Sequence, residues 1–568
     1  MNKPVLEWGS APGSEAGAPA PYATHEVVNQ SGPIAEYNAF DRDPVLTGAL
    51  ERGSANWAHD RLFAYGAIIG SERMTLLARQ ANRNLPELKT FDRFGNRIDE
   101  VDFHPAYHEC MALVFGHDVH SLAWKDERPG AHLARGILSY LANQGEQGVC
   151  CPMGMTFAGV PAIRSLPQLA QQWEAKILSN QYDPRPLPMH QKNGVTLGMA
   201  MTEKQAGSDL RQTLTRARPI SAGTGPGSEH LLTGHKWFTS VPMSDAFLTL
   251  AQTESGVSCF FFPRLLPDGT RNRMQIQRLK DKCGNKSNAS SEIELHDAWA
   301  IMLGEEGHGI RAILEMGHLC RQDFAIGSAG LMRQALTQAL WHTGHRRAFD
   351  TLLTQRPLLA NVLADLAIEV EGATLLALRM AQAQDESAGS DTERLLARIG
   401  TPVAKFWNCK RAPWVVVEAL ECHGGNGYIE EGVMARLYRE APLNSIWEGT
   451  SNMMCLDVQR VIQRETASVD ALMTELRLAQ SQNNRYQAFI DGLGRELKET
   501  HNSESRARRV TERIALGLQA NLLIRHSTSD VADAFVSSRM ADQWSGAFGT
   551  LDCEEDAMKR IIARASVA

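Results

Sequence analysis

The spacing of apolar residues divides the chain into helical and β-rich regions. In the stretches "YHECMALVFGHDVHSLAW" and "HLARGILSYLANQGEQ", apolar residues recur at intervals of three and four, which places them on one helix face. Between about Leu197 and Leu303, short β-type runs such as "AFLTLAQT" and "GVSCFFFPRLL" alternate with turn clusters such as "GTGPGS" and "LPDGT". Long amphipathic patterns follow. The order predicted is helix, strand, helix, helix.

The same pattern predicts five segments and an α+β multidomain fold. Residues 1–35, rich in small residues and proline, are expected to be a flexible tail. Residues 36–196 are predicted to form a helical domain, and residues 197–303 an antiparallel β domain, either a barrel or a sandwich. Residues 304–463 are expected to form a helical bundle, and residues 464–568 a further helical extension.

Composition and charge describe an ordinary globular protein. The chain has 568 residues, 43% hydrophobic and 22% charged, so several domains are expected. The net charge of -7 gives no global basic field, and any contact with DNA must come from a local patch. Because the chain has no signal-type segment and no long apolar run, we expect a cytoplasmic protein without membrane contact. Its ten cysteines form no metal-type cluster, which predicts free thiols and no metal site.

Two segments could bind a flat polar ligand outside a Rossmann fold, whose glycine signature is missing from the sequence. In "MTEKQAGSD", hydroxyl groups flank a turn and could hydrogen-bond a ring edge or a phosphate, although a plain turn is the alternative. In "GHKWFTS", two aromatic residues precede two hydroxyl residues. This arrangement suits a heteroaromatic ligand, but it would also suit core packing.

Two further segments lie closer to the C-terminus. The glycines of "HGGNGY" allow the backbone to approach a ligand closely, or they form a simple connector. The stretch "NSIWEGTSN" places Glu448 between Trp447 and Gly449. Glu448 is either a solvated turn residue or a base whose pKa is raised by burial beside the indole.

In this order, the segments resemble those of the acyl-CoA dehydrogenase superfamily. The matching patterns are T-E-x-x-A-G-S-D, G-x-K-W-x-T/S, the "GEEGHG" that opens the bundle, G-G-x-G-Y and the segment of the glutamate base. Within the superfamily, "FHPAYHE", "CPMGMTFA", "RLKDKCGNKSNASSE" and the C-terminal extension resemble the AidB branch, the bacterial alkylation-response proteins. The resemblance implies an FAD cofactor between the β domain and the bundle.

The resemblance also implies which residues contact FAD. They are Met201, Thr202, Gly207, Ser208, Trp237, Phe238, Thr239, Ser240, Gly424, Gly425, Gly427, Ile446, Trp447, Gly449, Thr450, Ser451 and Asn452. Arg346 and Phe349 match a motif that reaches FAD from a neighbouring subunit, which implies a homotetramer. The match is incomplete, because Asp350 replaces the glycine of that motif and Pro357 stands where many dehydrogenases have glutamine.

The resemblance assigns catalytic roles to two residues. Glu448 would remove the α proton of an acyl-CoA thioester while a hydride passes from the β carbon to the flavin. Arg321 matches a bundle arginine near the active site and would limit the rise in the pKa of Glu448.

The AidB resemblance also implies binding to double-stranded DNA without sequence preference. The stretch "SRARRVTER" places three arginines on one helix face, and a further pair lies at the start of the extension. These candidates are Arg460, Arg464, Arg506, Arg509 and Arg513. The alternative is a solvated face paired with Glu504 and Glu512.

Two functions remain open at this point. One is an FAD-containing, AidB-like protein that binds DNA in the adaptive response to alkylation damage and has weak or vestigial dehydrogenase activity. The other is a genuine acyl-CoA dehydrogenase of catabolism, of the isovaleryl- or fatty-acyl-CoA type. Fold-level analogy does not separate them.

Overall fold

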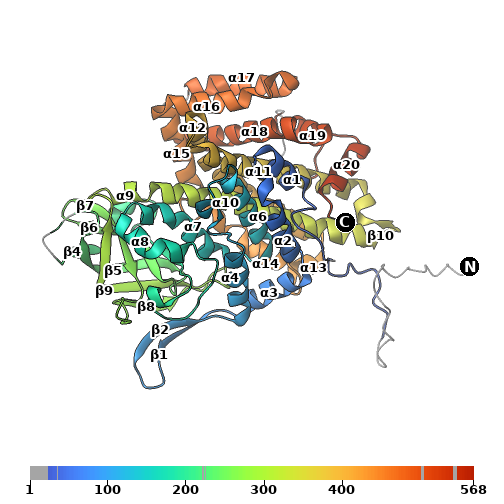
Figure 1. The fold of residues 1–568 in the computed structure, drawn as a ribbon. Coiled ribbons are helices and arrows are strands. Elements are labelled where there is room, and N and C mark those ends of the chain that lie inside the picture. Colours follow the sequence, from blue (N-terminus) through green and yellow to red (C-terminus); the bar gives the residue numbers. More distant parts are fainter. Residues whose placement is uncertain are drawn as a thin grey trace, which may run out of the picture.

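The computed structural model describes residues 24–34, 36–220, 223, 225–499, 504–540 and 546–567. Figure 1 shows a β domain beside a large helical body, with a helical layer stacked on that body. Of the predicted tail, residues 1–23 and 35 lie outside the described part. Residues 29–32 contact the bundle, where the side chain of Asn29 pairs with the backbone of Arg347 in both directions, whereas residues 24–28 are exposed.

The N-terminal domain is helical because its apolar stripes pack on each other and on the bundle. Several of its helices begin at a side-chain cap; Asp43, for example, accepts a hydrogen bond from the backbone of Val45 at 3.1 Å. The helices are α1 (Pro44–Arg52), α2 (His59–Ile69), α3 (Glu72–Arg83), α4 (Pro105–Gly116), α5 (Leu122–Lys125), α6 (Ala131–Gly145), α7 (Cys150–Arg164) and α8 (Pro167–Ile177).

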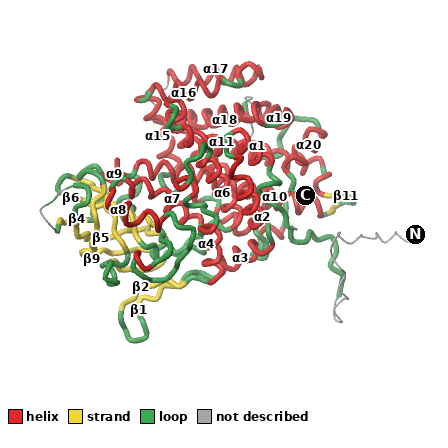
Figure 2. Tube along the Cα trace, viewed as in Figure 1, coloured by secondary structure: helices red, strands yellow, loops and turns green. Residues whose placement is uncertain are grey.

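A β-hairpin interrupts this domain, which sequence analysis described as helical throughout. Strands β1 (Glu87–Phe91) and β2 (Arg97–Asp102) pair antiparallel and project from the body (Figure 2). The carboxylate of Asp92 accepts hydrogen bonds from the backbone of Phe94 and Asn96, and Gly95 adopts a φ of 86°. A run this short between two helical patterns gives a weak periodic signal, so the prediction missed it.

The β domain is a closed ring of strands with two strands added. In the ring, β6 pairs with β7, β7 with β9, β9 with β5, β5 with β4, and β4 with β6; β3 joins β6, and β8 joins β9. The strands are β3 (Leu197–Ala200), β4 (Arg216–Pro219), β5 (Glu229–Ser240), β6 (Ala246–Thr253), β7 (Gly256–Pro263), β8 (Met274–Leu279) and β9 (Ser290–Leu303). The predicted domain was purely antiparallel, but β3 and β4 run parallel to β6. The long connections between these strands allow this crossover.

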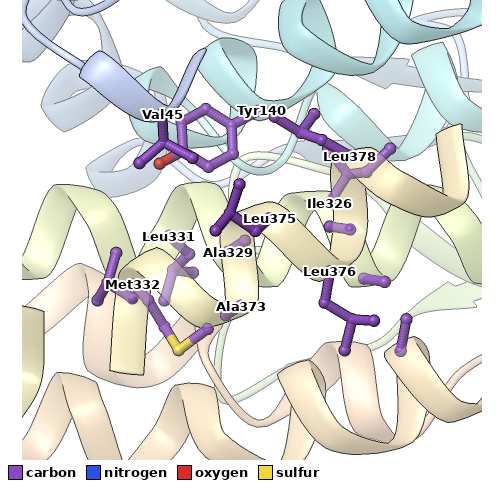
Figure 3. Close-up of a cluster of buried hydrophobic side chains, with 14 of the residues drawn as sticks. Val45, Tyr140, Ile326, Ala329, Leu331, Met332, Ala373, Leu375, Leu376 and Leu378 are labelled. Atoms are coloured by element: carbon purple, nitrogen blue, oxygen red, sulfur yellow. The ribbon is translucent and has the colours of Figure 1, made fainter. Parts of the chain in front are cut away.

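The bundle is built on three long helices that share a buried core. These are α10 (Leu314–His345), α11 (Pro357–Glu386) and α12 (Asp391–Glu421). Figure 3 shows side chains of α10 and α11, such as Ile326 and Leu375, meeting Tyr140 of α6. The shorter elements are α9 (Gly309–Ala312), β10 (Arg347–Ala348), β11 (Thr351–Leu352), α13 (Gly425–Tyr428), α14 (Met434–Glu440) and α15 (Ser451–Arg464).

Buried ion networks join the C-terminal extension to the bundle. On α11, Arg379 bridges Glu393 of α12 and Glu475 of α16. Arg539 of α19 contacts Asp365 of α11 at 2.5 Å. The extension comprises α16 (Thr466–Arg477), α17 (Asn484–Glu499), α18 (Ala507–His526), α19 (Ser529–Arg539) and α20 (Glu555–Ala565). Because one apolar core also runs through bundle and extension, they form a single body.

The predicted fold class is confirmed: a helical domain, a β-rich middle domain and a helical bundle, followed by more helices. Within the described residues, no helix has both the length and the apolar character needed to span a membrane.

Candidate functional site

Glu448 lies in a strained turn between α14 and α15. A short 3-10 helix, Leu443–Ser445, precedes the turn, and α15 begins at Ser451. Glu448 has a φ of 50°, a left-handed conformation that is uncommon outside glycine, and Gly449 follows with a φ of 95°. A Cβ at Gly449 would lie 2.7 Å from Cε of Met454. The positive φ is what favours glycine here, because the flexible end of Met454 could move aside.

Two cations from the long bundle helices hold this turn. Lys405 of α12 is buried, and its Nζ donates hydrogen bonds to the carbonyl oxygens of Trp447 and Gly449, each at 2.5 Å. Arg321 of α10 donates to the carbonyl oxygen of Glu448 at 3.4 Å and pairs with Asp457 at 2.8 Å. The structure thus places Arg321 beside Glu448, and it adds Lys405, which sequence analysis missed.

The turn is enclosed by aromatic side chains. Trp447 stacks on Phe324 of α10 with ring centroids 5.0 Å apart, and its indole N–H donates to Asn444 at 3.1 Å. Burial raises the pKa of Glu448, while Lys405 and Arg321 oppose that rise. Within the described chain, the carboxylate itself makes no hydrogen bond or ion pair, so its oxygens remain available to a ligand.

On the β-domain side, the two predicted ligand segments are adjacent. The backbone N–H of Trp237 donates to the carbonyl oxygen of Thr202 at 2.8 Å. Beneath them lies a fully buried ion pair between Glu203 and Lys236, with 2.8 Å between Nζ and Oε1. Although burial alone would raise it, the pKa of Glu203 is held at about 2 by Lys236 and by hydrogen bonds from Thr215. The pair anchors the turn of residues 201–208, and sequence analysis did not identify it.

A buried cysteine joins the β-domain segments to the glutamate. Cys151 lies at the start of α7, where its thiol interacts with Ser240 of β5 and with the charge of Glu448. Burial, the main cause, raises the pKa of Cys151 to about 11, so it remains a neutral thiol. Met201 and Trp447 pack against the same apolar cluster. Residues from both domains therefore line one region.

This region fits the flavin that the family resemblance implies. The hydroxyl of Thr239 is fully buried and has no hydrogen-bond partner among the described residues, so it is available to a ligand's polar edge. Phe238 next to it is 48% exposed, and Trp237 is partly exposed. Lys280 of the β8–β9 connection places its Nζ 3.2 Å from the centroid of the Trp237 ring. Flat aromatic surfaces, a free hydroxyl and a nearby cation suit a heteroaromatic group that carries phosphates.

A second group of the predicted cofactor residues lies away from the Glu448 turn. Arg346, Phe349 and the glycines lie at the other end of the bundle, where His342 stacks on His423 at 4.7 Å. There, a guanidinium N–H of Arg346 donates to the carbonyl oxygen of Asn29 at 2.7 Å, and Phe349 is 82% exposed. No hydrogen bond or ion pair connects this group to the Glu448 turn within the described chain.

The predicted DNA-contacting arginines on α18 and on the 3-10 helix Glu504–Arg506 before it surround one acidic residue. Arg506, Arg509 and Arg513 all contact the carboxylate of Glu496 on α17, at 2.9, 3.2 and 2.9 Å. Their salt-bridge partner is thus Glu496, whereas the sequence pattern suggested Glu504 and Glu512. Arg509 and Arg513 also act electrostatically on Glu512, so three guanidiniums face two carboxylates and the cluster keeps a positive charge.

The second predicted arginine group is at the junction of α15 and the extension. Arg460 is 57% exposed and lies 3.8 Å from Asp457, and Arg464 is exposed at the end of α15. At the start of α15, Asn452 accepts a hydrogen bond from Arg508 of α18 at 2.8 Å. Asn452 was predicted as a flavin contact, but its amide oxygen is used by the extension.

A ring of β-strands between two helical domains, with a shielded carboxylate facing their junction, defines a flavoprotein of the acyl-CoA dehydrogenase class. Family models match in the same order: the AidB N-terminal domain of adaptive response proteins over residues 29–184, the acyl-CoA dehydrogenase middle domain over 198–298 and its C-terminal domain over 307–463. The chain is 44% identical to "Putative acyl-CoA dehydrogenase AidB" of Escherichia coli over 517 residues, which are 90% of this chain and 94% of that protein. It therefore belongs to the AidB family of acyl-CoA dehydrogenase-like proteins.

Two solved structures extend the comparison. The crystal structure of Caenorhabditis elegans ACDH-11 in complex with C11-CoA is similar with a TM-score of 0.84 and 27% identity, over 93% of this chain and 96% of that one. An acyl-CoA dehydrogenase of Bacillus anthracis complexed with FAD shares the fold, with a TM-score of 0.60 and 16% identity over 81% and 82% of the two chains. FAD is the cofactor of the acyl-CoA dehydrogenase family, to which this chain belongs.

Proposed function

We propose that this chain is an FAD-containing, AidB-like protein that binds double-stranded DNA in the adaptive response to alkylation damage. In this proposal its acyl-CoA dehydrogenase activity is weak. The observation that carries the proposal is the similarity to AidB over 90% of the chain, which extends beyond the acyl-CoA dehydrogenase domains.

The arginine cluster supports the DNA part of the proposal. Side chains of Arg506 and Arg509 are 44% and 64% exposed, and Arg513 is 25% exposed, so their guanidiniums are accessible from solvent. Arginine contacts to phosphates give binding that is independent of sequence and sensitive to salt. We propose the same role for Arg460 and Arg464 at the edge of the extension.

Fluorescence anisotropy of a labelled duplex tests this surface. A simple triple substitution of Arg506, Arg509 and Arg513 to Gln would remove three cations from the buried carboxylate of Glu496, so Glu496→Gln is added to the same variant. We expect this quadruple variant to fold and to bind duplex DNA at least about tenfold more weakly, because each phosphate contact contributes to affinity. The matched control, Arg394→Gln, removes an exposed arginine elsewhere. If the quadruple variant binds like wild type, the proposed surface is wrong.

The Glu448 geometry supports a second candidate, a working acyl-CoA dehydrogenase. FAD supplies a hydride acceptor when it is bound. Glu448, with its unpaired carboxylate and raised pKa, would take the proton from the α carbon of the thioester. The stacked rings of Trp447 and Phe324 keep bulk water away from this carboxylate, and Arg321 fixes its backbone.

Flavin absorbance separates the two candidates. The oxidised flavin is mixed with a panel of acyl-CoA esters, and bleaching is followed over time. A catabolic enzyme predicts rapid bleaching by one ester and its loss in Glu448→Gln. Slow bleaching by every ester, together with duplex binding, supports the AidB-like proposal, whereas rapid turnover without duplex binding supports the catabolic one.

We also propose that the protein is a cytoplasmic homotetramer. Large apolar side chains are exposed at the bundle end that carries Arg346, among them Phe349, Leu358, Trp414 and Tyr428, which are 65–82% exposed. Light scattering tests this assembly: we expect a mass four times 62.6 kDa, and a lower mass when Leu358 is changed to Glu. A wild-type monomer would overturn the proposal.

A further inference from the structure

The ammonium group of Lys405 is enclosed inside the bundle beside the candidate base. The residue is only 1% exposed and lies on α12, opposite the connection between α14 and α15. Its Nζ lies 5.5 Å from the centroid of the Phe324 ring, so its surroundings are largely apolar. A charge in this position is costly unless it has strong partners.

Its partners are two carbonyl groups on either side of one residue. Nζ donates to the carbonyl oxygens of Trp447 and Gly449, and both bonds are short at 2.5 Å. Between these carbonyls stands Glu448, whose left-handed backbone conformation is strained in a non-glycine residue. Two charge-assisted hydrogen bonds to the flanking carbonyls offset this strain and fix the direction of the Glu448 side chain.

The second effect of Lys405 is electrostatic. Groups from several elements face Glu448: Lys405 of α12, Arg321 and Cys320 of α10, and Cys151 of α7. Arg321 is already paired with Asp457, and both cysteines are neutral thiols because burial raises the pKa of each. Lys405 pairs only with carbonyl dipoles and has no carboxylate partner within salt-bridge distance in the described chain. Its charge therefore acts on Glu448 more fully than that of Arg321.

We propose that Lys405 is a positioning residue for Glu448, which both clamps the strained turn and stabilises the ionised carboxylate. This inference rests on the proposed role of Glu448 as the base for an acyl-CoA thioester. Lys405 touches neither the substrate nor the reacting atoms in this proposal. It acts through the backbone of residues 447–449 and through its charge.

A thermodynamic cycle measures this coupling without any substrate. Four proteins are compared: wild type, Glu448→Gln, Lys405→Met and the double variant. The effect of Glu448→Gln on stability is measured by denaturation from pH 4 to pH 7.5, once in the wild-type background and once in the Lys405→Met background. Burial lowers the pKa of Lys405 to about 8, so the lysine keeps its charge through this range. Because Lys405 favours the ionised carboxylate, its removal shifts the pH range of this effect upward, by about one unit or more. Identical pH curves in the two backgrounds would overturn the proposal.

A second variant covers the case in which Lys405→Met prevents folding. Lys405→Gln keeps N–H donors but removes the charge, so it is expected to fold and still to shift the pH curve. Lys410→Met, on the same helix but partly exposed, is the matched control and leaves the curve unchanged. A crystal structure of the Lys405→Met variant gives a separate readout: we expect Glu448 to leave its left-handed conformation, and an unchanged turn would refute the clamp.

Flavin bleaching then links the cycle to chemistry. Where an acyl-CoA bleaches the wild-type flavin, Lys405→Met is expected to shift the rising limb of the pH–rate profile to higher pH. The shift should equal, in pH units, the one found in the stability measurements. Failure of all acyl-CoA esters to bleach the wild type would refute dehydrogenase activity, yet the cycle would still decide whether Lys405 acts on Glu448. The two failures are thus distinguishable.

Discussion

Arg508 of the C-terminal extension donates a hydrogen bond from its Nε to the amide oxygen of Asn452, at 2.8 Å. Asn452 is the second residue of α15, directly after the turn that carries Glu448. A helix of the extension thus contacts the segment that holds the candidate base. Because the same helix α18 carries the arginine cluster, the two proposed sites of the protein share one rigid element.

The first prediction concerns this contact. Arg508→Ala is expected to leave global stability within about 1 kcal/mol, because the pair is exposed. It should nevertheless release the first turn of α15, so amide hydrogen exchange in residues 451–454 becomes faster. Hydrogen exchange with mass spectrometry measures this effect, and Arg394→Ala is the control. Unchanged exchange in α15 would show that the contact does not stabilise the turn.

The second prediction concerns the unpaired hydroxyl of Thr239. Thr239→Val keeps the side-chain shape and removes a buried group without a partner, so the apoprotein should keep its stability or gain some. FAD affinity should fall about tenfold, the effect of one lost neutral hydrogen bond of roughly 1.4 kcal/mol.

Thr249→Val is the matched control for this test. Thr249 is equally buried, but its hydroxyl donates to the carbonyl oxygen of Ala200 at 2.5 Å. This control should destabilise the apoprotein without a specific effect on FAD. Equal FAD affinity in the Thr239→Val variant and the wild type would contradict the assignment of Thr239 to the flavin site.

The third prediction uses pH and the buried acid Glu440. Its carboxylate accepts a hydrogen bond from the backbone of Asn285 at 2.6 Å, and burial together with Glu146 raises its pKa from 4.5 to about 7. The folded state therefore binds the proton more tightly than the unfolded state, and stability falls as pH rises from 4.5 through 7. A glutamine at position 440 keeps a side-chain oxygen that can accept the hydrogen bond from Asn285, and it stays neutral as pH rises.

Glu440→Gln should therefore gain stability over wild type across this pH range, by at most about 3 kcal/mol above pH 7. Urea denaturation between pH 4 and pH 8 measures the difference. Glu421→Gln, at an exposed position at the end of α12, is the control. A constant difference between Glu440→Gln and wild type at all pH values would disprove the explanation.

The fourth prediction tests how the extension is attached to the bundle. Arg539 is 1% exposed and neutralises both Asp365 and Glu369 of α11. Arg539→Met leaves buried carboxylates without this cation and should cost about 3–5 kcal/mol in the free energy of unfolding. Arg560→Met removes an exposed pair with Asp530 and should cost less than about 1 kcal/mol. Similar losses for both variants in urea denaturation would contradict the buried network.

The candidate site could be predicted from the sequence where its chemistry is local. Glu448 stands in a short motif beside an indole and a glycine, and the structure gives it the left-handed turn and partial burial that such a motif allows. The hydroxyl and aromatic residues of "GHKWFTS" were also readable, because they follow one strand. The fold class followed from the change between helical and β-type patterns.

Contacts between distant elements could not be predicted in this way. Lys405 looks like an ordinary lysine in an apolar helix, since the carbonyls that it binds belong to a turn that follows α12 and α14. The sequence did not reveal Glu496 as the partner of the arginine cluster. Glu496 lies on α17, whereas helical spacing points only to acidic residues close in sequence, such as Glu504 and Glu512. The hairpin and the parallel strand pairs likewise depend on chain packing that periodicity does not record.

The salt dependence of duplex binding tests the central claim most directly. The wild-type protein is titrated against a labelled duplex of arbitrary sequence at several salt concentrations. The account predicts binding that weakens steeply with salt, with a slope of log K against log salt of roughly -3 or steeper for three or more phosphate contacts. A second duplex of different sequence should give the same line. No binding at about 50 mM salt, or a slope near zero, would contradict DNA binding through the arginine surface.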